Sequence, residues 1–138
     1  MSVVTVYRKA HFNAAHRLYN SAWSDAKNKD VFGKCSNPHY HGHNYDLIVG
    51  VTGPVDPETG FVISLNELKS IIKREVEEPL DHKNLNIEVQ EFSKLIPTAE
   101  HIAIVIWNRL RPHLSETLDL EVKLYETPRN FVIYNGNK

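Results

Sequence analysis

The sequence predicts an α+β fold in which helices pack against an antiparallel sheet. Stretches with alternating apolar and polar residues lie toward both ends of the chain, and two segments with helical periodicity lie between them. The expected order is strand, strand, helix, helix, strand, strand, which is typical of α+β proteins. The chain has 138 residues and no repeat or linker-like stretch. We therefore expect one domain over residues 1–138.

The first two predicted strands cover residues 3–16 and about residues 41–52. In the first, apolar residues recur at every second position except Arg8, as in a strand with one buried face, and His16 falls on that face. Residues 17–38 between the two strands are polar and rich in turn formers. We expect a long irregular loop there, of a kind that often has a function. Residues 61–63 form a short strand-like run, and the two last predicted strands lie at about residues 119–126 and about residues 131–135.

The middle of the chain carries two helical patterns. Ser64 and Glu67 have capping-box spacing, and the apolar stripe behind them predicts a helix that Pro79 closes. A second apolar stripe predicts a helix that begins at Thr98 and closes at Pro112.

Composition excludes several classes of function. The formal net charge is −1, with 41% hydrophobic and 24% charged residues, so the chain is not a generally basic nucleic-acid binder. No apolar run is long enough to span a membrane, and the first residues lack a signal-peptide pattern, so we expect a cytoplasmic protein. Cys35 is the only cysteine, which excludes an internal disulfide. Eight histidines direct attention to metal or acid–base chemistry.

Three histidines form a candidate metal site. His41 and His43 are two apart on a predicted strand, so their side chains face the same side. His39 has the same spacing, but a straight strand places it roughly 13 Å from His43, too far to share one ion. His16 is the better third ligand if the first two strands pair. Three histidines suit a catalytic zinc with an open fourth position; the alternative is a core histidine beside an incidental pair.

Cys35 and the Asp81–His82 pair are candidates for acid–base work. Cys35 lies in the predicted loop, six residues before His41, and a nearby cation or metal would lower the pKa of its thiol. The alternative is a small buried apolar residue. Asp81 and His82 form either a solvated loop pair or, if His82 meets Cys35 in space, an oriented catalytic group.

Glu126, Thr98 and Glu100 are weaker candidates. Glu126 shares parity with the apolar residues of its predicted strand, so it either has polar partners, such as the N–H groups of a planar heterocycle, or is solvated beyond the strand. Thr98 and Glu100 are also ordinary helix-start residues.

Three segments resemble one known family. Residues 33–45 (GKCSNPHYHGHNY), 79–85 (PLDHKNL) and 125–127 (YET) are similar to the signature segments of 6-pyruvoyl tetrahydropterin synthases. They occur in the same order as in that family, and the resemblance extends over essentially the whole chain.

The resemblance implies a tunnelling fold (T-fold), in which a four-stranded antiparallel sheet carries two helices on one face. Three subunits would close into a barrel, and two trimers would stack into a homohexamer with active sites between subunits. The implied roles are Zn2+ binding by His16, His41 and His43; catalysis by Cys35 as general base, with Asp81 and His82 completing the group; and pterin binding by Glu126, with Thr98 and Glu100 nearby. No role is implied for His11, His39, His101 and His113.

The implied activity is that of a lyase that eliminates triphosphate from 7,8-dihydroneopterin triphosphate and gives 6-pyruvoyl-tetrahydropterin. A related enzyme, 6-carboxytetrahydropterin synthase of the queuosine pathway, uses the same substrate and releases acetaldehyde and triphosphate. Five residues separate Cys35 from His41, a spacing that favours the pyruvoyl branch. A different class stays open: a non-catalytic subunit that binds zinc or a pterin.

Overall fold

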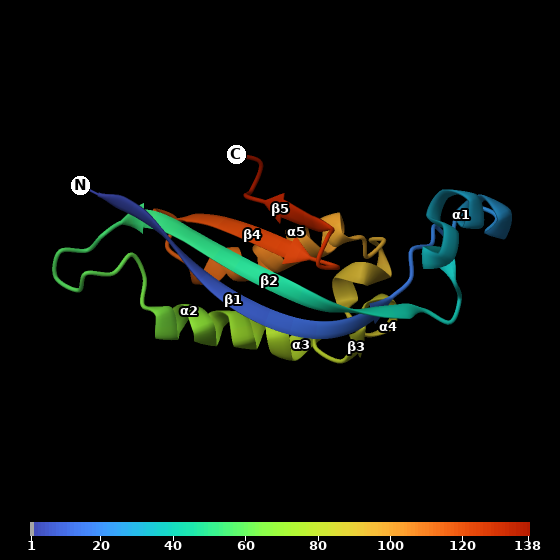
Figure 1. Cartoon of the computed structure of the whole chain (residues 1–138), viewed down its shortest axis with the longest axis horizontal. Helices are drawn as coiled ribbons and strands as arrows, with labels where there is room; N and C mark the ends of the chain where they lie inside the picture. Colours follow the sequence, from blue (N-terminus) through green and yellow to red (C-terminus); the bar gives the residue numbers. More distant parts are fainter. Residues whose placement is uncertain (1) are drawn as a thin grey trace.

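The computed structural model describes residues 2–138 and is built on a five-stranded sheet of order β3-β1-β2-β4-β5. The two long strands β1 (Val3–His16) and β2 (His41–Pro54) pair antiparallel along their whole length. Strand β4 (Asp119–Tyr125) pairs antiparallel with β2, and β5 (Phe131–Tyr134) pairs antiparallel with β4. Figure 1 shows these four strands as one twisted layer.

The sheet has five strands where four were expected. The additional strand, β3 (Lys83–Asn84), is two residues long and pairs parallel with Ala14 and Ala15 of β1. A strand of two residues is too short to show an alternation of apolar and polar side chains, so hydrophobic periodicity could not predict it. The run at residues 61–63, expected to be strand-like, is irregular in the structure.

Two helical elements cover one face of the sheet. Helix α2 (Leu65–Ile72) continues through a π-helical turn (Lys73–Glu77) into α3 (Glu78–Leu80), and α5 (Ala99–Leu110) packs beside them. Figure 1 shows α2 and α3 along the length of β1. None of the helices within residues 2–138 is long and apolar enough to cross a membrane.

The first of these helical elements ends at Leu80, one residue beyond the predicted stop at Pro79. Proline has no N–H to donate to the carbonyl four residues earlier, which is that of Glu75. The π-helical turn changes the backbone hydrogen-bond pattern of the helix just before Pro79. Arg109 Nη1 donates to the Glu75 carbonyl at 3.3 Å and thereby satisfies it. The proline is therefore accommodated near the helix end.

The expected irregular loop is partly helical. Helix α1 (Asp25–Phe32) and a 3₁₀ turn (Gly33–Ser36) occupy its second half, so the prediction of a long structureless segment was wrong. Ser24 caps α1, and the buried Asn28 side chain donates to two backbone carbonyls. Because α1 has no apolar stripe, its sequence carried no helical periodicity. Figure 1 shows α1 projecting beyond the sheet, at the end where β1 finishes and β2 begins.

The core lies between the sheet and the helices. Tyr45 and Phe12 stack with ring centroids 4.9 Å apart and are fully buried, and both lie on the strand face that ends in His16. The other large, fully buried side chains are Leu47, Leu68, Ile72, Leu80, Leu85, Ile102, Ile106, Leu110 and Leu124. The opposite sheet face is more open and exposes Tyr7, Phe131 and Ile133. The core therefore holds the strand ends from which the candidate ligands project.

Candidate metal centre and active site

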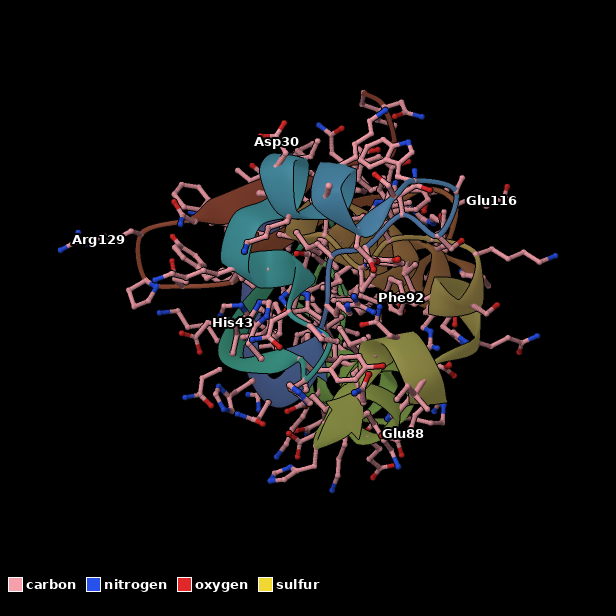
Figure 2. All side chains as sticks on the ribbon, turned by 90° about the vertical axis from the view of Figure 1, so that its right-hand side faces the viewer. Asp30, His43, Glu88, Phe92, Glu116 and Arg129 are labelled. Atoms are coloured by element: carbon pink, nitrogen blue, oxygen red, sulfur yellow. The ribbon has the colours of Figure 1, made fainter. Side chains whose placement is uncertain are left out.

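His16, His41 and His43 meet at one end of the sheet. His16 pairs with His41 in the β1–β2 ladder, and Ala14 pairs with His43, so all three imidazoles face the same side. One nitrogen of each ring lies within 4.8 Å of one nitrogen of the others. Figure 2 looks along the sheet from this end, with His43 labelled. The structure thus brings together the three residues that the sequence selected.

Four of the six ring nitrogens of this cluster lack a hydrogen-bond partner within residues 2–138. His16 Nε2, both nitrogens of His41 and His43 Nε2 are buried and make no hydrogen bond within residues 2–138. Burial, reinforced by the neighbouring imidazoles, lowers the pKa of His16 to about 4, and burial lowers the pKa of His41 as well. Neutral imidazoles with free lone pairs are the form that binds metal. Buried nitrogens without partners are costly, and a divalent ion would satisfy them. The donor set therefore fits zinc.

The orientation of His16 is fixed from its other side. Its Nδ1 donates to the Pro97 carbonyl at 2.7 Å, and the Tyr45 hydroxyl lies 3.4 Å from the same nitrogen. A carbonyl only accepts, so the proton is on Nδ1 and the lone pair of Nε2 faces the cluster. Tyr45 has the same parity as His41 and His43, which could have marked it as a neighbour of the site. A backbone carbonyl such as that of Pro97 has no sequence signal.

Glu126 borders the histidine cluster. Strand β4 ends at Tyr125, one residue before the predicted end, yet the Glu126 side chain stays on the buried side. Its two carboxylate oxygens lie 3.9 Å from His16 Nε2 and 3.9 Å from His43 Nε2, and its side chain is 24% exposed. Glu126 therefore does lie just beyond the strand, as one of the two alternatives held, but its side chain is only partly exposed to solvent. The carboxylate adds a negative charge and two acceptor atoms to the mouth of the cluster.

Cys35 lies on a segment tied to the same strand end. It is in the 3₁₀ turn after α1, and its carbonyl accepts from Leu18 N at 2.8 Å, two residues beyond His16. Arg17 Nε donates to the Ser36 carbonyl at 2.8 Å. Burial raises the pKa of Tyr45, and the nearby Glu126 and Cys35 side chains add smaller contributions in the same direction. Cys35 is half-buried, beside the end of β1 that carries His16.

Asp81 and His82 meet each other on the outer edge of β1. Asp81 Oδ1 accepts from Asn13 N at 2.8 Å, and its Oδ2 lies 2.9 Å from His82 Nδ1. The bond from Asn13 and the contact with His82 lower the pKa of Asp81. His82 has a φ of 60°, its N donates to the Asn13 carbonyl, and its side chain is 81% exposed. Within residues 2–138, no hydrogen bond or ion pair joins this pair to Cys35 or the histidine cluster.

Thr98 and Glu100 are at the start of α5. Thr98 is the N-cap, and its Oγ1 accepts from His101 N at 3.2 Å. Glu100 is exposed in the first turn, where its charge favours the helix dipole. Because Thr98 follows Pro97, the N-terminus of α5 lies against His16. Thr98 is thus close to the cluster, whereas Glu100 makes no hydrogen bond to it within the described residues.

Comparisons with known proteins agree on one family. A family model described as 6-pyruvoyl tetrahydropterin synthase matches residues 5–137. The 6-pyruvoyl tetrahydrobiopterin synthase of Pongo abelii is 46% identical over 131 residues, which cover 95% of this chain and 90% of that protein. The structure of Caenorhabditis elegans 6-pyruvoyl tetrahydropterin synthase superposes with a TM-score of 0.93 at 40% identity, covering 99% of this chain and 98% of that one. The 6-carboxy-5,6,7,8-tetrahydropterin synthase of Haemophilus influenzae is 32% identical over 122 residues, covering 74% of this chain and 84% of that protein.

Proposed function

The chain belongs to the 6-pyruvoyl tetrahydropterin synthase family, and from this premise we propose that it is a zinc-dependent lyase acting on 7,8-dihydroneopterin triphosphate. The product is 6-pyruvoyl-tetrahydropterin, as in the synthesis of tetrahydrobiopterin-type pterins. The observation that carries the proposal is the cluster of three histidines whose buried nitrogens lack hydrogen-bond partners in residues 2–138, beside a segment that bears a thiol.

Zinc would be held by His16, His41 and His43, and would leave a position open for substrate oxygen. When bound, it supplies Lewis acidity to the hydroxyl oxygens of the substrate side chain. The protein contributes the fixed direction of His16 Nε2, because the opposite nitrogen is committed to the Pro97 carbonyl.

Glu126 orients the pterin ring in this proposal. Its carboxylate is an acceptor-only group with two oxygens, which suits the adjacent N–H donors of the planar ring. Its position beside His16 and His43 supports this role, because a ring held there would carry its side chain toward the histidine cluster. Thr98, at the start of α5, would border the same space.

Cys35 acts as the general base. The thiolate removes a proton from a carbon of the substrate side chain, the neighbouring C–O bond breaks, and triphosphate leaves with the electron pair. The same thiol then returns a proton during the rearrangement. Oxidation of the side chain to a diketone is balanced by reduction of the ring, so no external redox cofactor is required.

Asp81 and His82 would complete the catalytic group from a second chain. Within one chain they lie on the outer edge of β1 and form no hydrogen bond or ion pair with Cys35 in the described residues. Their pairing and the high exposure of His82 suit a group offered to a neighbouring subunit. We therefore propose active sites between subunits, in a homohexamer of two stacked trimers.

Product analysis tests the proposal. The purified, zinc-loaded protein is incubated with 7,8-dihydroneopterin triphosphate, and the products are identified by mass spectrometry. We expect 6-pyruvoyl-tetrahydropterin and triphosphate. A carboxypterin with acetaldehyde would move the chain to the other branch of the family. Unchanged substrate that remains bound would indicate a non-catalytic binding subunit and overturn the proposal.

A further inference from the structure

The turn that precedes α5 presents the carbonyl that orients His16. Residues 96–98 form this turn, and the Pro97 carbonyl at its centre accepts from His16 Nδ1 at 2.7 Å in a buried position. The direction of this carbonyl sets which imidazole nitrogen carries the proton, and therefore where the free lone pair of Nε2 points. Whatever holds the turn in shape therefore has an influence on the histidine cluster.

His101 holds the turn from the first turn of α5. Its Nδ1 donates to the Ile96 carbonyl at 2.7 Å, and its backbone N donates to Thr98 Oγ1 at 3.2 Å. The Ile96 carbonyl also accepts from Thr98 N at 2.8 Å. Both bonds to Ile96 lie on one side of Pro97, directly next to the peptide whose oxygen contacts His16. One imidazole thus links the helix, the turn and the preceding residue.

This arrangement differs from an ordinary helix cap. In a capping box, a Glu or Gln three residues after the N-cap accepts from the N-cap N–H. Here that position is His101, which donates instead, and its acceptor lies two residues before Thr98. Thr98 already supplies the side-chain cap of α5. The helix cap therefore does not require the bond from His101 Nδ1. This bond instead fixes the geometry of the turn.

We propose that His101 is a positioning residue of the metal centre: through the Ile96–Thr98 turn it aims the Pro97 carbonyl at His16 Nδ1. The inference rests on the proposed zinc site for its effect on metal affinity. Its effect on the protonation of His16 is independent of any metal. Within residues 2–138, His101 itself forms no hydrogen bond or ion pair with His16, His41, His43 or Glu126.

Two substitutions that are nearly isosteric with each other test the role of His101 Nδ1 as a hydrogen-bond donor. In His101→Asn, the amide Nδ2–H stands as many bonds from the backbone as imidazole Nδ1 and can donate to the Ile96 carbonyl. In His101→Asp, the ionised side chain only accepts, so the bond is lost. Aspartate in the first helical turn is favourable for the helix itself. If residue 101 only stabilised the helix, the Asp variant would therefore orient His16 and bind zinc at least as well as the Asn variant.

The first readout is the protonation of His16 in the metal-free protein. Two-bond ¹H–¹⁵N correlation spectra distinguish an imidazole protonated on Nδ1 from one protonated on Nε2. We expect the Nδ1–H form in the wild type and in His101→Asn. We expect a mixture of both forms in His101→Asp, and the same in His101→Ala if the Asp variant does not fold.

The second readout is the zinc dissociation constant, measured by competition with a chelator. We expect His101→Asn to stay within about 2-fold of the wild type and His101→Asp to bind about 10-fold more weakly, since outer partners of metal ligands typically contribute 10–100-fold. The added negative charge of Asp would by itself favour zinc, so weaker binding cannot come from that charge.

Ser64→Ala is the matched control, because it removes the side-chain cap of α2 without touching the turn. It should lower stability and leave both readouts unchanged. An Nδ1–H signal and a zinc affinity in His101→Asp that equal those of the wild type would overturn the inference. If the wild type itself binds no zinc, the proposed metal centre fails, while the His16 spectra still decide the role of His101.

Discussion

The three histidines have different surroundings, and this decides what each substitution does. His16 is almost fully buried and tied to Pro97, whereas both nitrogens of His41 are buried without any protein partner in the described residues. His43 is 19% exposed at the mouth of the cluster, next to Glu126. Substitution of His41 therefore removes a proposed ligand while leaving the bond between His16 and the Pro97 carbonyl intact, so it tests the proposed metal site with the fewest other changes.

His41→Ala is expected to weaken zinc binding by more than about 100-fold, beyond the effect of losing an outer partner. Zinc content after dialysis against a chelator, measured by elemental analysis, checks this. His39→Ala is the matched control, because His39 is exposed and precedes the strand. A His41→Ala protein that retains one zinc per chain would refute the ligand assignment.

Cys35→Ala is expected to lower kcat by roughly 10²–10⁴-fold, the range of general acid–base contributions, with zinc content unchanged. The physical reason is that the proton of the substrate side chain then has no acceptor at this position. Triphosphate release and bound zinc are measured on the same preparation. Turnover at the wild-type rate would remove Cys35 from the mechanism.

Glu126→Gln separates pterin binding from metal binding. The amide keeps the shape but loses the charge, and charged hydrogen bonds contribute about 1.5–3 kcal/mol, so we expect roughly 10–100-fold weaker binding of neopterin in fluorescence titrations. Zinc affinity should change much less. Glu121→Gln, on the other face of β4, is the control. A larger loss of zinc than of neopterin would make Glu126 a metal ligand rather than the pterin anchor.

At the scale of elements, long regular patterns were predictable and short or polar ones were not. The alternation in residues 3–16 predicted β1 at the residues where it is found, and the apolar stripes predicted α2 and α5. Helix α1 was missed because buried polar contacts of Asn28 and a serine cap hold it, and neither produces a hydrophobic period. Strand β3 forms only because the tertiary fold places Lys83 and Asn84 beside β1.

In the candidate site, too, only the features set by regular strand geometry were predictable from the sequence. The shared face of His41 and His43 was a consequence of strand geometry, and their meeting with His16 required only that β1 and β2 pair. The Pro97 carbonyl and the His101 bond could not be predicted, because they depend on where α5 begins relative to β1. Sequence patterns also could not predict that Asp81 bonds to Asn13 and His82 rather than to Cys35 within the described residues, since this depends on tertiary placement.

An ion pair links α5 to the segment before it and gives stability a pH dependence. Arg109 holds both carboxylate oxygens of Glu91 at 2.7 Å and thereby lowers the pKa of Glu91 below its ordinary value of 4.5. The contribution of this ion pair to the free energy of unfolding is complete above pH 4.5. It is lost as the pH falls through the lowered pKa of Glu91, where the folded state also takes up the proton.

Urea unfolding of the metal-free protein should therefore show a smaller loss of unfolding free energy between pH 7 and pH 3 in Glu91→Gln than in the wild type. Because Glu91 is partly exposed, the difference will be modest. Glu116→Gln, at an exposed position, serves as control. Equal losses in the wild type and Glu91→Gln would show that this pair does not set the acid sensitivity.

At the scale of the whole molecule, the proposed catalytic group requires two chains. Cys35 is beside the histidine cluster, and Asp81 and His82 are on the outer edge of β1. Chains carrying Cys35→Ala and chains carrying His82→Ala should each be nearly inactive alone. Dissociated and reassembled together, they should regain activity, because some sites then receive both intact groups. No recovery in mixed assemblies, verified by mass spectrometry, would place the complete site within one chain.

The central claim is that zinc on His16, His41 and His43 enables the elimination of triphosphate. Metal-free protein is titrated with zinc, and the initial rate of triphosphate release from 7,8-dihydroneopterin triphosphate is measured at each step. We expect a rate that rises in proportion to added zinc and levels off at about one ion per chain, the capacity of a single three-histidine site. Full activity without zinc, or a zinc-saturated protein that releases no triphosphate, would contradict it.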